Sequence, residues 1–167
     1  DVEYFNIELD EVLAEWVTLE PQIAEITQVV KQGESIDIDE CHIDFIYSYH
    51  DGLFSNLMND SSLVFSVTTP NKKVLFLGDL GPEGGDVLYE ESRHLLKSDI
   101  VQMAHHGHGN VGMEVYAAIM PDVCMWCCAD WLYNEPEIPY YLADRKKLRS
   151  MQRERMYGTT VTRKWME

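Results

Sequence analysis

Two short apolar segments of the chain each end abruptly in residues that carry chemistry. Residues 73–77 run into Gly78-Asp79, and residues 100–104 run into His105-His106-Gly107. Short apolar runs bounded by turn residues are typical of buried strands. Sites in open α/β sheets form beyond the carboxyl ends of the strands. We therefore expect the carboxylate and the imidazoles to meet at one sheet edge, where they suit Zn²⁺, Mn²⁺ or Fe.

A third motif precedes these two. Asn59-Asp60-Ser61-Ser62-Leu63-Val64-Phe65 is a polar turn that leads into an apolar strand. Between about residues 55 and 131, the three motifs resemble in order and spacing the second half of a metallo-β-lactamase-fold hydrolase. The likeness is greatest to the hydrolase domain of bacterial DNA-uptake competence proteins. It implies an α/β fold, the C-terminal half of an αββα sandwich with a mixed sheet.

The resemblance also implies a function. It predicts a metal-dependent hydrolase that cleaves an ester or a phosphodiester with a metal-bound hydroxide. The cofactors would be two divalent ions, with zinc favoured over manganese or iron. Asp79 would bridge the two ions. His106 would complete the second site and His105 would face the substrate, although the sequence leaves the reverse assignment open, because adjacent residues of an extended chain point opposite ways.

One defining feature of that family is missing from this sequence. None of the six histidines is spaced as His-x-His-x-Asp-His, and the chain opens on Asp1. We therefore interpret residues 1–167 as a single domain that is the C-terminal part of a larger metallo-hydrolase and is inactive alone. Its expected partners are the N-terminal half of the same domain or a second copy, because half a sandwich exposes apolar strands.

The charge of the chain restricts its other partners. Thirteen basic and 29 acidic residues give a formal net charge of −16. Nucleic-acid binding needs clustered Lys and Arg, so this balance argues against it and favours a small ester or phosphoester substrate. No apolar run reaches the length of a membrane span. A cytoplasmic location is favoured, although a fragment would have lost any signal peptide.

Two other classes of protein stay open. One is a non-catalytic acidic interaction domain that keeps the fold without the active site. The other is a calcineurin-like phosphoesterase, which also has Gly-Asp after a strand. That class is expected to continue with Gly-Asn-His and a late Gly-His-x-His, whereas this chain has Gly109-Asn110-Val111 and lacks the second motif.

The remaining patterns predict the other elements. Helices are expected at 8–31, 87–97, 113–120 and 138–156, and strands at 36–49, 62–68, 73–77, 100–104, 124–128 and 159–163. Residues 69–72 predict a hairpin turn and residues 81–85 a flexible loop. Strand alternation places Ile43, Phe45 and Tyr47 on one face, and separates Cys124 and Cys128 from Cys127 as packing residues. Asn59 is expected to fix its own turn, and His42, His50 and His94 to be packed or surface residues.

Overall fold

The computed structural model describes residues 30–50, 52–53, 55–108, 111–128 and 156–158. Every helix and strand below lies within residues 31–167, which form one compact unit. The helices expected at 8–31 and 138–156 fall outside the described residues apart from their ends, and the strand expected at 159–163 falls entirely outside them.

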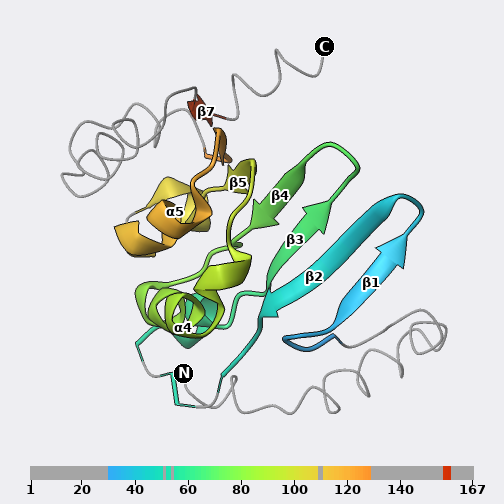
Figure 1. Cartoon of the computed structure of the whole chain (residues 1–167). Helices are drawn as coiled ribbons and strands as arrows, with labels where there is room; N and C mark the ends of the chain where they lie inside the picture. The colour runs from blue at the N-terminus through green and yellow to red at the C-terminus, as the bar shows by residue number, and fades with distance from the viewer. Residues whose placement is uncertain (1–29, 51, 54, 109–110, 129–155, 159–167) are drawn as a thin grey trace, which may run out of the picture. The chain divides into compact units, whose positions relative to one another are not determined.

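Seven strands form one mixed sheet, and they lie side by side in chain order (Figure 1). The first four strands are antiparallel neighbours, whereas the last four are parallel neighbours. The predicted α/β class with a mixed sheet is confirmed. The strands are β1 (Ser35–Ile38), β2 (Cys41–Tyr47), β3 (Val64–Thr68), β4 (Lys73–Phe76), β5 (Ile100–Gln102), β6 (Val123–Trp126) and β7 (Met156–Gly158).

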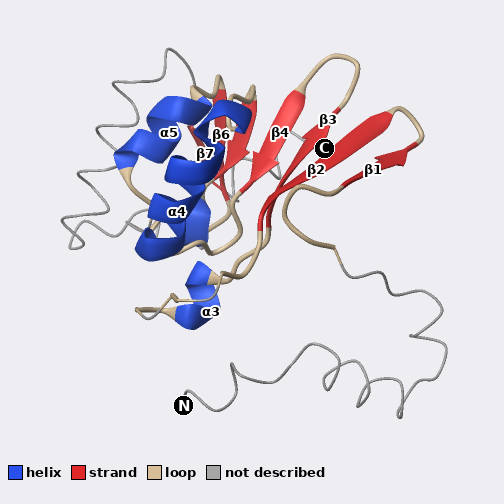
Figure 2. Ribbon diagram, turned by 60° about the horizontal axis from the view of Figure 1, so that its bottom comes forward, coloured by secondary structure: helices blue, strands red, loops and turns tan. Residues whose placement is uncertain are grey.

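Helices connect the parallel strands. The helix α4 follows β4 and α5 follows β5, and both lie on the same side of the sheet (Figure 2). No helix within the described residues is long and apolar enough to cross a membrane. The helical elements are α3 (Leu57–Asp60), α4 (Pro82–Ser92), the 3₁₀ turns η2 (Arg93–Leu95) and η3 (Ala104–Gly107), and α5 (Met113–Ile119).

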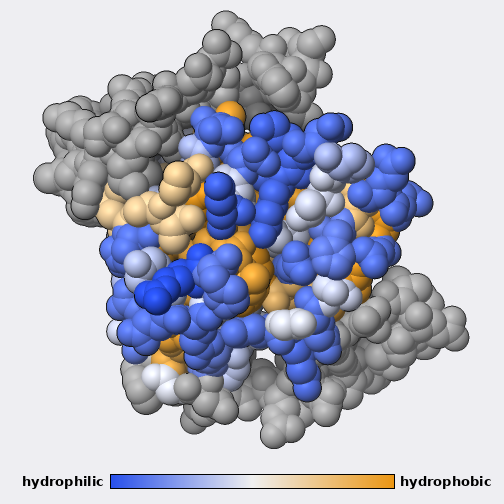
Figure 3. All heavy atoms as spheres, in the orientation of Figure 1, coloured by the Kyte–Doolittle hydropathy of each residue, from blue (hydrophilic) through white to orange (hydrophobic). Residues whose placement is uncertain are grey.

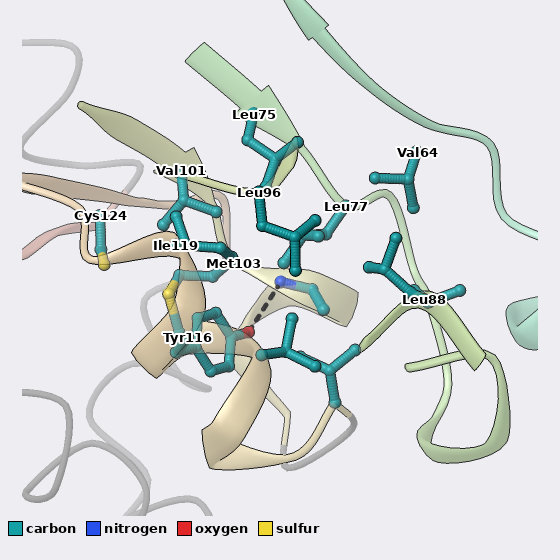
Figure 4. Close-up of a cluster of buried hydrophobic side chains, with 14 of the residues drawn as sticks. Val64, Leu75, Leu77, Leu88, Leu96, Val101, Met103, Tyr116, Ile119 and Cys124 are labelled. Atoms are coloured by element: carbon teal, nitrogen blue, oxygen red, sulfur yellow. Dashed lines mark hydrogen bonds between the residues drawn. The ribbon is translucent and has the colours of Figure 1, made fainter. Parts of the chain in front are cut away.

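The core lies between the sheet and these two helices. Leu75, Val101 and Cys124 are opposite one another on β4, β5 and β6 and are fully buried. They belong to one cluster with Leu88 of α4 and Ile119 of α5 (Figure 4). Removing such side chains from water is the main driving force for this layer. Polar residues cover much of the surface seen in Figure 3, with apolar residues visible between them.

The other face of the sheet is apolar as well. The register of β2, β3 and β4 aligns Phe45, Phe65 and Phe76 in one row. The rings of Phe65 and Phe76 stack at 4.9 Å, and those of Phe45 and Phe65 lie 6.4 Å apart. A second row is aliphatic and consists of Ile43, Val67, Val74, Ile100 and Val123. We name these two rows the apolar sheet face.

The expectation of one strand at 36–49 is wrong in two respects. A turn at Asp39, whose φ is 52°, divides the segment into β1 and β2. A β-bulge then shifts the register between Phe45 and Tyr47, so that Phe45 is opposite Phe65 but Tyr47 is opposite Val64. A bulge adds one residue to a strand and breaks the alternation of its faces. Tyr47 therefore joins the core beneath α4.

The flexible loop expected at 81–85 is also wrong. The helix α4 begins at Pro82, with Gly81 as its N-cap, and includes both following glycines. A Cβ added to Gly84 would lie 2.8 Å from the Tyr47 hydroxyl. The glycine therefore serves close packing rather than flexibility. The expected hairpin is confirmed, because Thr68 pairs with Lys73 across a turn.

The cysteines pack as the strand pattern predicts. Cys124 and Cys128 are buried, whereas Cys127 is exposed, although β6 ends at Trp126 rather than at Cys128.

Candidate functional site

The ends of β4 and β5 lie side by side because the two strands are parallel neighbours in register, with Phe76 opposite Gln102. Beyond them, the His105 amide donates a hydrogen bond to the Gly78 carbonyl at 2.9 Å. The two motifs that the sequence predicts at one sheet edge are thus joined directly. His106 Nε2 lies 3.7 Å from Asp79 Oδ1.

Gln102 holds the two strand ends in register. Its Oε1 accepts hydrogen bonds from the amides of Leu77 and Gly78 at 3.1 and 2.8 Å. Its Nε2 donates to the carbonyls of Gly78 and Met103 at 3.2 and 2.5 Å. Sequence reasoning missed this residue. The available signal was a lone polar side chain in the apolar run 100–104.

The histidine pair does not continue the strand as expected. His105 and His106 lie in η3 with φ of 45° and 59°, and Gly107 follows with φ of 81°. A left-handed conformation costs a non-glycine residue roughly 1–2 kcal/mol. His105 and His106 are therefore not extended, and the expected alternation of their side chains does not hold here. Backbone strain of this kind concentrates at functional sites.

The buried residue Trp126 supports this turn. Its indole Nε1 donates a hydrogen bond to the His106 carbonyl at 2.6 Å. A Cβ added to Gly107 would overlap the same indole, so only glycine fits there. No local sequence pattern reveals the bond of Trp126 to a residue 20 positions earlier.

The surroundings of His106 determine which ring nitrogen carries its proton. Its Nδ1 lies 2.8 Å from the Cys127 carbonyl oxygen, which can only accept a hydrogen bond. Nδ1 therefore carries the proton in the neutral ring, and Nε2 keeps its lone pair on the side of Asp79. Both side chains are about half exposed, at 52% for His106 and 46% for Asp79. The Nε2 lone pair on the side of Asp79 favours His106 over His105 as a metal ligand.

His105 lies between two other rings. Its ring centroid is 5.9 Å from that of His106 and 5.1 Å from that of His108. Burial lowers the pKa of His108 below its ordinary value, and the neighbouring histidines lower it further. This lowered pKa favours the uncharged form of His108. The Asn59 carbonyl accepts a hydrogen bond from the Ser62 amide at 3.0 Å in the turn that it was expected to fix, and its side-chain Nδ2 also lies 3.4 Å from His105 Nδ1.

The other described histidines lie outside this site, as the sequence predicts. His42 lies between two aspartates on β1 and β2. His50 is bonded to Gln32 and stacks on Tyr47. His94 is exposed on η2.

A carboxylate and a neutral imidazole are suitable ligands for Zn²⁺ and related ions. His106 also has the carbonyl partner on its second nitrogen that metal-binding histidines usually have. Across the described ranges, however, no group of three or more His, Cys, Asp or Glu side chains is arranged to hold a metal ion. Asp79 and His106 therefore fit as part of a donor set that further ligands would complete.

No family model matches the sequence, and no curated protein matches it. The function proposed below therefore depends on the motifs and on the geometry of this site.

Proposed function

We propose that the chain is part of a metal-dependent hydrolase of the metallo-β-lactamase type, with Asp79 and His106 as two of its metal ligands. One observation carries the proposal. His106 donates from Nδ1 to a backbone carbonyl, while its Nε2 lies 3.7 Å from the Asp79 carboxylate. Such a carbonyl partner orients a ligating ring and makes it more basic.

A bound divalent cation would supply Lewis acidity, which lowers the pKa of water and polarises an ester or phosphoryl oxygen. The chain's own residues supply orientation. Gln102 fixes the strand ends, and Trp126 fixes the His106 backbone. His105, on the same turn, would face the substrate.

The same proposal includes the arrangement of the whole domain as an αββα sandwich. In an αββα sandwich, two sheets pack about 10 Å apart through apolar faces. The apolar sheet face has the composition for such a layer. The N-terminal half of the same domain would supply the second sheet and a His-x-His-x-Asp-His cluster with the missing ligands.

The proposed substrate is a small ester or phosphoester rather than duplex DNA. The chain has 29 acidic and 13 basic residues, and its charge of −16 repels a polyanion. Metal ions, rather than a basic surface, would hold an anionic substrate. Binding of the full-length gene product to duplex DNA across a salt series tests this, and tight binding with a steep salt dependence would contradict it.

Zinc titration of the chain by calorimetry tests the metal site. We expect weak binding, because an incomplete ligand set leaves most of the shell to water. Binding should be lost in Asp79→Ala and in His106→Ala. It should persist in Asp86→Ala, which removes an exposed carboxylate from α4. Equal affinity in all four proteins would overturn the proposed ligands.

The second candidate is a non-catalytic acidic interaction domain. It is favoured by the presence of only two suitably placed ligands among the described residues. The gene upstream of the Asp1 codon separates the two candidates. A His-x-His-x-Asp-His motif within about one domain length, roughly 100 residues, supports the hydrolase. A start codon directly before Asp1 supports the interaction domain.

A further inference from the structure

The short helix α3 is anchored by a buried carboxylate. Asp60 is fully buried, and its Oδ1 accepts a hydrogen bond from the Gly84 amide of α4 at 2.9 Å. Its Oδ2 accepts from the Asn56 amide at 3.2 Å. The Tyr47 hydroxyl donates to the Asp60 carbonyl at 2.5 Å. Two of these contacts tie the C-terminal end of α3 to the core, and the third links its N-cap Asn56 to the same carboxylate, so the position of Asn59 between them is determined.

Asn59 extends from this anchored helix to the candidate site. Its side-chain Nδ2 lies 3.4 Å from His105 Nδ1, across 46 positions of sequence. An amide nitrogen only donates, so the Nδ1 atom that receives its hydrogen bond must carry the lone pair. In the neutral ring, the proton of His105 is then on Nε2.

These two contacts favour opposite tautomers in the adjacent histidines. His106 faces a carbonyl oxygen, which places its proton on Nδ1. His105 faces an amide nitrogen, which places its proton on Nε2. The first ring keeps an Nε2 lone pair suited to a metal, whereas the second keeps an Nε2 proton suited to an ester or phosphate oxygen.

We propose that Asn59 is a positioning residue that holds His105 as an Nε2–H donor toward the oxygen of an ester or phosphoester substrate. The substrate side of this inference rests on the proposed hydrolase function. The tautomer of His105 does not, because it is argued from the contact of its Nδ1 with the Asn59 side chain. If Asn59 had only a structural role, replacing its amide by a carboxylate would leave the proton of His105 on Nε2.

The test is ¹⁵N NMR of the histidine rings in the intact chain at about pH 8.5, two units above the ordinary imidazole pKa. We expect wild-type His105 to be protonated on Nε2 and His106 on Nδ1. Asn59→Asp, which is nearly isosteric and replaces the donor by an acceptor, should move the His105 proton to Nδ1. His106 should be unchanged.

Asn71→Asp is the matched control, because it adds the same charge at an exposed turn. It should leave both rings as in the wild type. The wild type alone already tests the inference, because an Nδ1 proton on its His105 would overturn it. The test therefore does not depend on whether Asn59→Asp folds. An unchanged His105 in folded Asn59→Asp would also overturn it. If the wild type shows these tautomers but does not bind zinc, only the hydrolase proposal is refuted.

Discussion

Gly107 is the residue with the least freedom at the candidate site. Its φ of 81° lies in the left-handed region, and an added Cβ would overlap the Trp126 indole. We predict that Gly107→Ala lowers the free energy of unfolding by about 1–2 kcal/mol because of the left-handed backbone. The overlap with the indole should lower it by a further ~1–3 kcal/mol. Urea unfolding measures this loss. It should accompany displacement of the His106 carbonyl from its indole donor, seen as a changed Trp126 ring signal in NMR.

Gly33 offers a matched control for this prediction. It has a similar φ of 86°, but an added Cβ would meet nothing within 4 Å. Gly33→Ala should therefore lower the free energy of unfolding only by the backbone contribution, about 1–2 kcal/mol. Equal losses in the two variants would show that the contact with Trp126 is not restrictive.

His42 makes the stability of the β1–β2 hairpin depend on pH. Its Nδ1 lies 2.6 Å from Asp37 Oδ1 and its Nε2 lies 3.1 Å from Asp44 Oδ1. Both partners are acceptors, so only the doubly protonated ring satisfies both. The hydrogen bond with Asp37, then the charge of Asp44, raises the pKa of His42 above its ordinary value. This stabilisation is complete below about pH 6.5 and is lost as pH rises through the higher folded-state pKa.

We therefore predict that the melting temperature of the wild type exceeds that of His42→Gln most at about pH 5.5 to 6.5, and that the difference disappears at alkaline pH. Thermal unfolding followed by circular dichroism at a series of pH values measures it. A difference that is constant, or that grows with pH, would contradict the assigned contacts.

At the scale of elements, the junction of β4 and β5 depends on one side chain. Gln102 accepts from the Leu77 and Gly78 amides. We predict that Gln102→Leu destabilises the chain by about 1–3 kcal/mol, because these partly buried amides lose their acceptor. Hydrogen exchange at Gly78 should accelerate by more than global destabilisation explains.

The Thr69 amide is the internal reference for this measurement. It donates to the Lys72 carbonyl at the opposite end of β4, at 2.8 Å. Its exchange should follow global stability only. Similar acceleration at both amides would mean that Gln102 contributes to general packing rather than to the junction.

Elements with strong local patterns were predictable. The turn after Thr68 and the apolar strands β4 and β5 follow from residues close in sequence. The bulge before Tyr47 was not predictable, because it depends on packing beneath α4. The start of α4 at Pro82 was also missed, because Gly84 is required by close contacts with Asp60 and Tyr47, and Gly85 by contact with Val111, rather than by local flexibility.

At the scale of the whole molecule, the apolar sheet face predicts association. Its aromatic row consists of Phe45, which is buried, and of Phe65 and Phe76, which are partly exposed. Contiguous apolar surface that stays in contact with water drives proteins together. We expect light scattering to detect dimers whose fraction rises with concentration, and Phe76→Gln to weaken them. Met120→Gln is the control, because Met120 is 68% exposed in the loop after α5. A wild type that stays monomeric would contradict the prediction.

The sequence by itself determined the α/β class and the meeting of Asp79 with the histidine pair at one sheet edge. Apolar runs and turn residues act locally, and parallel neighbouring strands bring their carboxyl ends together. Only the tertiary structure decided how the two histidines differ. That difference comes from the Cys127 carbonyl and the Asn59 amide, 21 and 46 positions away. Hydrogen bonds between such distant groups form only after the chain has folded, so no local pattern encodes them.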